Sequence, residues 1–230
     1  MNKSFTSKLQ KLTPKIGELS KKYSTAFEIK PEEAEIVSRK GTLYTAFDIE
    51  DSKDIDTMLV TKFVRDILHD YYYGFENASP IQALEKSILE LKNKLANLGT
   101  EIEFNIITAV LWGNILYIVE YGTGKTFLLR NNEIKSINSA SEGNFNIASG
   151  VVKEDDVVIL ATKDFFESYD PAELMTRATP ISAYDLTEKA SSIILKFEVS
   201  SAFSDNDFIN FAPSDGTKKS GNNLKNTISK

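Results

Sequence analysis

The sequence has 230 residues and a net charge of −6, with no cysteine and a single histidine, His69. A chain of this length forms one large domain or two small ones, and it can bury roughly 70–75% of its unfolded surface without disulfides or metals. The lack of cysteine excludes disulfides, zinc–thiolate sites and thiol nucleophiles. A single histidine argues against a serine triad and excludes a cluster of histidine metal ligands.

Charge is unevenly distributed along the chain. Residues 1–23 carry +5 and residues 213–230 carry +3, so the segment between them carries −14. An acidic body disfavours nucleic acid as a partner, because phosphates attract clustered lysine and arginine. No apolar run is long enough to span a bilayer, and the first residues lack the apolar core of a signal peptide. We expect a cytoplasmic protein that has no integral membrane segment and binds no nucleic acid.

The first 24 residues differ from the rest in composition. Apolar residues from Leu9 to Tyr23 recur at helical spacing between lysines, but Pro14 interrupts the pattern. We interpret residues 1–24 as a basic N-terminal arm. It is either an amphipathic segment that contacts an acidic partner or a membrane surface, or a frayed terminus partly packed on the body.

The following part predicts a strand and two helices. Residues 41–49 have the pattern of a strand, and over residues 56–73 apolar pairs recur every four residues, which is typical of a helix with one wide apolar face. A capping box begins at Ser79, with Pro80 at the first helical position and Gln82 reaching back. It opens a second helix, which we expect to end at Gly99.

Beyond Gly99 the apolar period changes to two. Short strands separated by tight turns, one of them at residues 122–125, are predicted over residues 102–112, 115–121, 126–130 and 133–137. This order is typical of an antiparallel meander. Five consecutive apolar residues at 157–161 indicate a strand buried on both faces. A short helix opening at Asp170 and a strand over residues 193–199 follow, and the polar residues 203–230 are expected to be disordered.

Residues 122–126 read Gly-Thr-Gly-Lys-Thr, which matches the end of a phosphate-binding P-loop. The full pattern needs a glycine five positions before Gly124, where Val119 stands. It also needs a helix after the lysine, where a strand and a turn are predicted. We therefore interpret this segment as a turn and not as a nucleotide site.

Three stretches, taken in order, resemble the PPM-type (type 2C) metal-dependent protein phosphatases. Leu-Tyr-Thr-Ala-Phe-Asp at residues 43–48 is similar to the strand that ends in F-D-G-H-G-G in that family. Residues 107–130 are similar to its hairpin, S-T-A followed by L-Y-V-A-N-V-G-D-S-R-A-Y-L, and residues 157–167 to its L-L-L-A-S-D-G-L-W-D motif. The resemblance covers about residues 25–200.

The resemblance implies an α+β fold in which helices flank two packed antiparallel β-sheets, a four-layer α-β-β-α sandwich. In active members, two metal ions at one end of the sandwich activate a water for attack on phosphate. The first metal-bridging aspartate matches Asp48, but Ile49 follows it in place of the family's glycine. The second metal aspartate falls on Lys163, and the third falls on Lys189 or Ala190.

Two divalent ions within about 4 Å of each other need several anionic ligands. On this resemblance one of three carboxylates is kept, and a lysine stands where another should be. The ammonium of Lys163 could pair with Asp48 in place of a metal, or Lys163 is a surface lysine at a strand end. We expect no metal cofactor at these degenerate positions.

Two hypotheses about function follow. In the first, residues 25–202 form a catalytically inactive, pseudophosphatase-like domain that serves as a protein-binding or regulatory scaffold for a protein partner, between the arm and a polar tail at 203–230. In the second, the chain is a divergent Mn²⁺- or Mg²⁺-dependent phosphoserine/threonine protein phosphatase. Its metal ligands would then have moved to Asp48, Glu50, Asp51 and Asp164.

Overall fold

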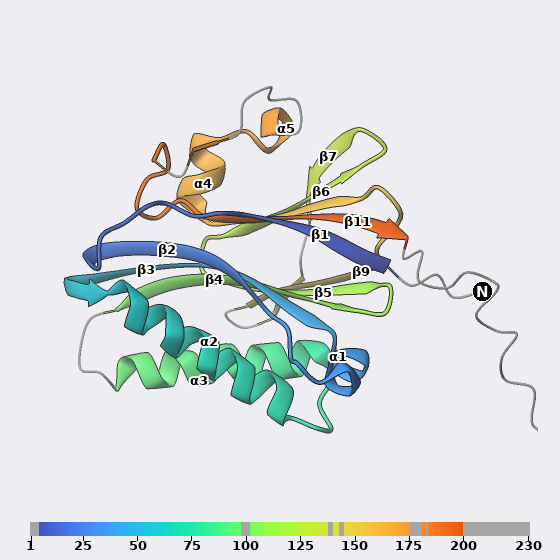
Figure 1. The fold of residues 1–230 in the computed structure, drawn as a ribbon, viewed down its shortest axis with the longest axis horizontal. Helices are drawn as coiled ribbons and strands as arrows, with labels where there is room; N and C mark the ends of the chain where they lie inside the picture. Colours follow the sequence, from blue (N-terminus) through green and yellow to red (C-terminus); the bar gives the residue numbers. More distant parts are fainter. Residues whose placement is uncertain are drawn as a thin grey trace, which may run out of the picture. The chain divides into compact units, whose positions relative to one another are not determined.

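Two antiparallel β-sheets face each other, and helices lie on the outer face of each sheet (Figure 1). The computed structural model describes residues 5–97, 102–137, 140–142, 145–174, 181–182 and 184–199. The five-stranded sheet has the order β1–β11–β10–β6–β7, with strands Phe5–Leu12, Ser192–Val199, Val157–Ala161, Lys125–Arg130 and Glu133–Ser136. The six-stranded sheet has the order β2–β3–β4–β5–β9–β8, with strands Leu19–Ile29, Thr42–Asp56, Glu103–Trp112, Ile115–Tyr121, Phe145–Val151 and Ala140–Glu142.

The helices complete the layers. Helices α2 (Thr57–Gly74) and α3 (Pro80–Ala96) cover the six-stranded sheet, and α4 (Lys163–Ser168) and α5 (Pro171–Leu174) lie on the side of the five-stranded sheet (Figure 1). The short helix α1 (Ala34–Lys40) joins β2 to β3. The predicted α+β sandwich of two antiparallel sheets flanked by helices is therefore confirmed.

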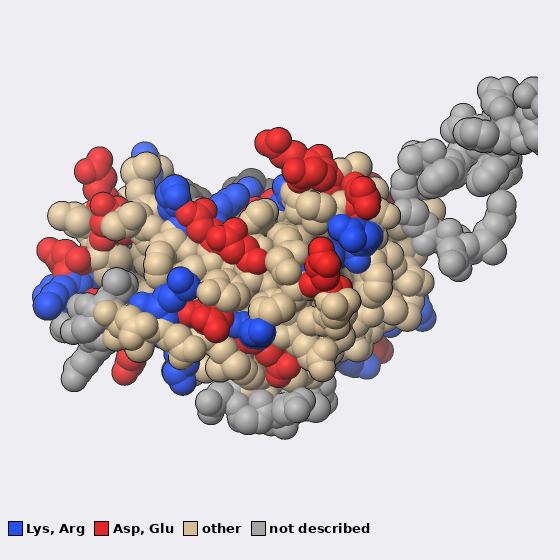
Figure 2. Space-filling view, turned by 90° about the horizontal axis from the view of Figure 1, so that it is seen from below, with Lys and Arg blue, Asp and Glu red and all other residues tan. Residues whose placement is uncertain are grey.

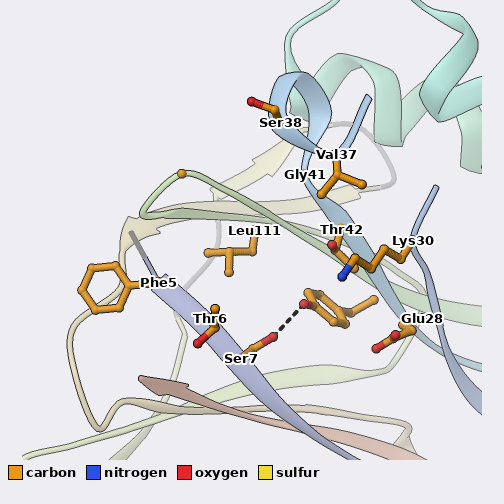
Figure 3. Close-up of a pocket in the computed structure, with 12 residues that line it drawn as sticks. Phe5, Thr6, Ser7, Glu28, Lys30, Val37, Ser38, Gly41, Thr42 and Leu111 are labelled. Atoms are coloured by element: carbon orange, nitrogen blue, oxygen red, sulfur yellow. Dashed lines mark hydrogen bonds between the residues drawn. The ribbon is translucent and has the colours of Figure 1, made fainter. Parts of the chain in front are cut away.

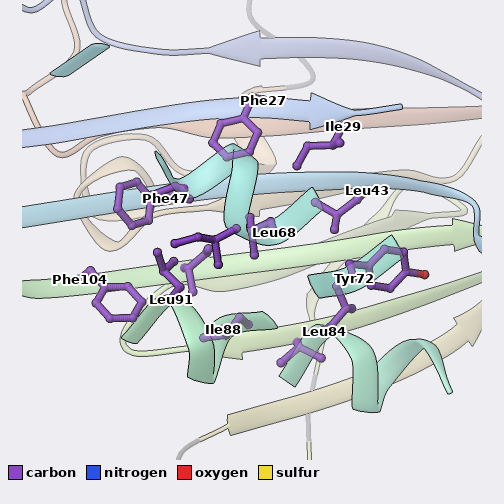
Figure 4. Packing of buried hydrophobic residues seen from close by; sticks show 14 of the residues in the cluster. Phe27, Ile29, Leu43, Phe47, Leu68, Tyr72, Leu84, Ile88, Leu91 and Phe104 are labelled. Carbon is purple, nitrogen blue, oxygen red and sulfur yellow. The ribbon is translucent and has the colours of Figure 1, made fainter. Parts of the chain in front are cut away.

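Strand alternation divides the side chains of β3 between two apolar layers. Tyr44 and Ala46 point into the layer between the sheets, whereas Leu43, Phe47 and Ile49 point toward α2 and α3. Figure 4 shows how closely the second layer is filled by side chains of β2, β3, β4 and the two helices. Fully burying a large apolar side chain stabilises the fold by about 1.5–3 kcal/mol, so these layers hold β3 firmly.

Both long helices confirm the sequence interpretation. The side chain of Ser79 accepts the N–H of Gln82, whose own side chain accepts the N–H of Ser79, so the predicted capping box is present at the start of α3. The predicted end of this helix at Gly99 lies outside the described residues. Helix α1 was not predicted from the sequence, since none of its residues is buried and it has no apolar stripe to reveal it.

The helical spacing of the apolar residues in the N-terminal arm does not correspond to a helix in the part of the arm that the structure describes. Residues Phe5–Leu12 form strand β1, which pairs with β11 from Phe5–Val199 to Leu12–Ser192. Phe5 and Leu9 pack on the layer between the sheets, and their spacing of four residues fits a strand as well as a helix. The open edge of β11 decides between the two structures, because it offers unpaired backbone groups to a neighbouring strand.

The predicted meander is also wrong in its connections. Strand β5 pairs with β4 and β9, whereas β6 pairs with β10 and β7 in the other sheet. Residues 122–124 therefore cross between the sheets and do not form a hairpin turn. Gly122 has a φ of 90°, and a Cβ on Gly124 would clash with the side chain of Ile107. Glycine lets the backbone make this tight crossing.

The exposed face of α2 and α3 carries charges of both signs. Figure 2 shows Lys and Arg interspersed with Asp and Glu across this face. This face presents no basic stripe of the kind that follows a phosphate backbone. Within the described part of the chain, no helix combines the length and the apolar character needed to cross a membrane.

Candidate functional site

The candidate site lies on β3, where the layer between the sheets changes from apolar to charged side chains. Asp48 follows Tyr44 and Ala46 on the same face of the strand and is only 2% exposed. Glu50, two residues further on, faces the same way. A carboxylate buried to this degree needs hydrogen bonds or a cation to offset the loss of water.

Asn105 supplies one of these hydrogen bonds. It lies opposite Asp48 in the register of β3 and β4, and its Nδ2 donates to Asp48 Oδ1 at 2.8 Å. Its Oδ1 accepts the backbone N–H of Thr123 at 3.0 Å. One asparagine therefore links the carboxylate to the crossing between the sheets.

The cation beside Asp48 belongs to Lys189. Its Nζ lies 3.6 Å from Asp48 Oδ1 and 3.2 Å from Glu50 Oε2. Lys22 reaches the other oxygen of Glu50, with 3.5 Å between Nζ and Oε1. The backbone of Lys189 is also held, because Thr162 Oγ1, just after β10, donates to its carbonyl at 2.7 Å. The side chains of Asp48, Lys189, Glu50 and Lys22 therefore form a row of alternating charge.

Burial and the neighbouring charges act in opposite directions on the pKa values in this row. Burial raises the pKa of Asp48 from 3.8 to about 6, although the hydrogen bond from Asn105 and the charge of Lys189 act in the opposite direction. Burial alone would lower the pKa of Lys189, but Asp48, Glu50 and Asp164 together raise it above its ordinary value. The hydrogen bond from Lys189 lowers the pKa of Glu50. Lys189 therefore stays charged at neutral pH.

Lys163 does not take the place that the sequence suggested for it. Helix α4 begins at this residue, and its Nζ lies 3.7 Å from Glu167 Oε1, one helical turn away, with half of the side chain exposed. Of the two alternatives for Lys163, the structure therefore supports a surface lysine at a strand end and not a pairing with Asp48, because the helix start turns this side chain away from β3. Lys189, the other lysine at a metal-aspartate position, makes that contact.

The remaining predicted positions are divided between the two faces of β3. Ile49 is buried among the side chains under α2 and α3. Strand alternation places Asp51 on the same side as Ile49, away from Asp48, and its Oδ1 accepts the N–H of Lys53. Asp164 is close enough to raise the pKa of Asp48 by charge repulsion. The structure thus brings Asp48, Glu50 and Asp164 near one another, and leaves Asp51 apart.

This donor set does not fit a pair of divalent cations. No group of three or more His, Asp or Glu side chains among the described residues is placed to hold a metal ion. Asp48 and Glu50 are the nearest anionic donors, and the ammonium of Lys189 lies within 3.6 Å of each. Two metal ions in contact with these carboxylates would have to displace that ammonium.

Comparison with known proteins identifies the fold. No sequence-family model matches the chain, and no curated protein matches its sequence. Solved structures do match: the serine/threonine phosphatase of S. agalactiae has a TM-score of 0.56 at 11% identity, over 85% of this chain and 100% of that one. PppA, a regulatory component of T6SS in Pseudomonas aeruginosa, has a TM-score of 0.55 at 12% identity, over 86% of this chain and 98% of that one.

A third matching structure contains metal ions. The catalytic domain of the serine/threonine phosphatase PstP, solved in complex with 2 manganese ions, has a TM-score of 0.53 at 9% identity, over 85% of this chain and 98% of that one. The fold of this chain is therefore that of the PPM-type serine/threonine phosphatases, as the motifs in the sequence indicated. At these identities the likeness shows the fold alone.

Sequence reasoning missed two members of the site. Asn105 and Lys22 carry no motif, and they meet Asp48 and Glu50 only because strands β2, β3 and β4 are neighbours in one sheet. The register that brings Asn105 opposite Asp48 depends on strand pairing, which the sequence does not display. The signal for Lys189 was present, since the resemblance had placed it on a metal-ligand position.

Proposed function

We propose that this chain is a PPM-fold protein without phosphatase activity, which acts as a binding or regulatory partner of another protein. The observation that carries the proposal is the ammonium of Lys189 between Asp48 and Glu50. By the resemblance, Lys189 or Ala190 falls where active members carry a metal-binding aspartate. Neither residue can supply the anionic ligand, and Lys189 adds a cation that pairs with the remaining carboxylates.

The charge balance supports loss of catalysis. In PPM-type phosphatases the attacking water is activated by metal ions, and no protein nucleophile replaces them. Here Lys189 supplies one positive charge, held in place by Thr162 through its backbone. An ammonium is not a Lewis acid, so it does not bind a water and lower its pKa as a divalent ion does. A chain with this arrangement retains the fold and loses the chemistry.

The surface supports a binding role. Three large apolar side chains are more than half exposed near the end of the sandwich that carries Glu50: Leu19 at 64%, Met58 at 76% and Leu59 at 65%. Leu19 lies opposite Asp56 in the β2–β3 register, and the N–H of Thr57 donates to the carbonyl of Glu18, so β2 lies against the first turn of α2. Apolar side chains gathered on a surface are typical of protein contacts.

Two measurements on the purified protein test the proposal. We expect Mn²⁺ and Mg²⁺ at millimolar concentration to leave the melting temperature unchanged, because a ligand of the folded state must stabilise it. We also expect no hydrolysis of p-nitrophenyl phosphate above background with Mn²⁺ present. Metal-dependent hydrolysis that Asp48→Ala abolishes would refute the proposal and favour the divergent phosphatase, with Asp164 and Asp51 as the first candidates for relocated ligands.

A further inference from the structure

A hollow of about 430 Å³ lies near the start of β3, several residues before Asp48 and away from the charged row described above (Figure 3). It lies between the two sheets, with β1 on one side and β2, β3 and the end of β4 on the other, and α1 closes one flank. This volume is within the usual range for small-molecule sites, about 300–1,000 Å³. Its chemistry is mixed, with hydroxyls, an acid, a base and apolar side chains.

Two hydroxyls from opposite sheets meet in the hollow. Ser7 of β1 and Tyr44 of β3 are hydrogen-bonded, with 2.7 Å between their oxygens, and the dashed line at Ser7 in Figure 3 marks this bond. Tyr44 is 4% exposed, and burial raises the pKa of its phenol, so the hydroxyl stays neutral. Each hydroxyl still has a free acceptor or donor position after this bond. These two neutral hydroxyls can therefore form hydrogen bonds with a polar ligand.

The charges of the hollow come from the end of β2 and the residue that follows it. Glu28 lies in the strand and Lys30 directly after its last residue, Ile29, with Cα atoms of Glu28 and Lys30 about 7 Å apart, and both side chains line the hollow. Within the described structure neither side chain has an ion-pair partner, and they do not pair with each other. An acid and a base held apart in the hollow leave room for a ligand that carries both charges.

One ligand class carries both charges. In an α-amino acid the ammonium nitrogen and the carboxylate oxygens are about 3 Å apart. With a hydrogen bond of about 2.8 Å at each end, such a ligand requires about 8 Å between the carboxylate of Glu28 and the ammonium of Lys30. A cationic ligand without an acid would leave Lys30 unpaired, and an anionic ligand without an amine would leave Glu28 unpaired.

Apolar groups complete the site. Val37 of α1 and Leu111 at the end of β4 project toward the hollow in Figure 3. They offer contact to an aliphatic or aromatic side chain of the ligand. Each methylene of that side chain that is buried in the hollow would favour binding through the hydrophobic effect. We propose that this hollow binds an apolar α-amino acid, with Glu28 receiving the ammonium, Lys30 the carboxylate, and Val37 and Leu111 the side chain. This site is independent of the function proposed above.

The test uses the full chain and L-leucine as the probe, in a melting-temperature titration followed by calorimetry. We expect L-leucine to raise the melting temperature by a few degrees at saturation. We expect isoamylamine, 4-methylpentanoate and glycine, which lack the carboxylate, the ammonium and the side chain of leucine, to give no comparable shift. The proposal is overturned if isoamylamine or 4-methylpentanoate raises the melting temperature as much as leucine does. It is also overturned if leucine at about 10 mM leaves the melting temperature unchanged.

Variants locate the site. Lys30→Met and Glu28→Gln should each weaken leucine binding by about tenfold or more, because each removes a charge-assisted hydrogen bond. Lys21→Met on the same strand and Glu32→Gln, both exposed and outside the hollow, are the matched controls and should bind as wild type does. Leucine binding that survives both Lys30→Met and Glu28→Gln places the ligand elsewhere and refutes the assignment.

Discussion

Replacing Lys189 by methionine removes the ammonium beside Asp48 and keeps a side chain of similar length. At 3.6 Å between the charged atoms, and an effective dielectric constant of about 20, the attraction lost is roughly 4–5 kcal/mol. Part of this is offset, because the ammonium is mostly buried and no longer has to give up water. We therefore expect Lys189→Met to lower the free energy of unfolding by about 2–3 kcal/mol at pH 8.

The loss should depend on pH with a definite sign. The pKa of Asp48 in the folded protein is about 6, against 3.8 for the ordinary group. A raised pKa means that protonation favours folding, so the stability from this carboxyl is fully present below about pH 4 and is lost as pH rises through about 6. Without Lys189 the folded pKa rises further. At pH 5 Asp48 of the variant is protonated and needs no cation, so the loss should be smaller than at pH 8.

Urea unfolding at pH 5 and pH 8, followed by circular dichroism, measures both values. Lys22→Met is the matched control, because Lys22 is half exposed and contacts only Glu50 of this row. Its effect should stay within about 0.5 kcal/mol at both pH values. The double variant Asp48→Asn with Lys189→Met should regain most of the stability, since no charge is then left buried. A loss for Lys189→Met that is equal at both pH values, or no larger than that of Lys22→Met, would refute this reasoning.

Lys189→Asp should create weak Mn²⁺ binding at millimolar concentration, measured by calorimetry, because it returns a carboxylate beside Asp48; Lys163→Asp alone should not, since Lys163 lies beside Glu167. Deleting residues 1–12 should lower the free energy of unfolding by at least about 3 kcal/mol, because it removes β1 and with it the packing of Phe5, Leu9 and Leu12 on the apolar layers; unchanged stability would contradict the role given to this strand. Gly124→Ala should destabilise the protein by about 1–3 kcal/mol, because its Cβ would clash with the buried Ile107. Lys125→Ala should stay within about 0.5 kcal/mol of wild type, and ATP with Mg²⁺ should shift the melting temperature of neither protein.

Local sequence was enough for the long elements. The apolar periods of α2 and α3, and the capping box at Ser79, act within one or two turns of helix, so they can be recognised without knowing the fold. Strand β10 is equally local, with five consecutive buried residues from Val157 to Ala161. Asp48 was found through the family resemblance, as the aspartate of the motif at residues 43–48, and β3 continues beyond it to Asp56.

The partners of the strands could not be predicted from local sequence, because strand pairing joins residues that are far apart in the chain. Phe5 and Leu9 have a spacing that suits a helix or a strand, and only the open edge of β11 makes them a strand. The crossing at Gly122 and Gly124 resembles a hairpin turn in sequence. It joins two sheets instead, because β6 finds its partner in β10 and not in β5.

The sequence by itself placed Asp48 in a strand with the family motif, and its resemblance to the PPM-type phosphatases placed Lys163, and Lys189 or Ala190, where active members carry metal-binding aspartates. Only the tertiary structure decided which lysine pairs with Asp48. Helix α4 starts directly after β10 and directs Lys163 toward Glu167, whereas the hydroxyl of Thr162 holds the backbone of Lys189. The ammonium of Lys189 therefore meets Asp48 and Glu50. The direction of a side chain at a strand end depends on where the next element begins and on which contacts hold the neighbouring loop. Neither can be read from the local sequence.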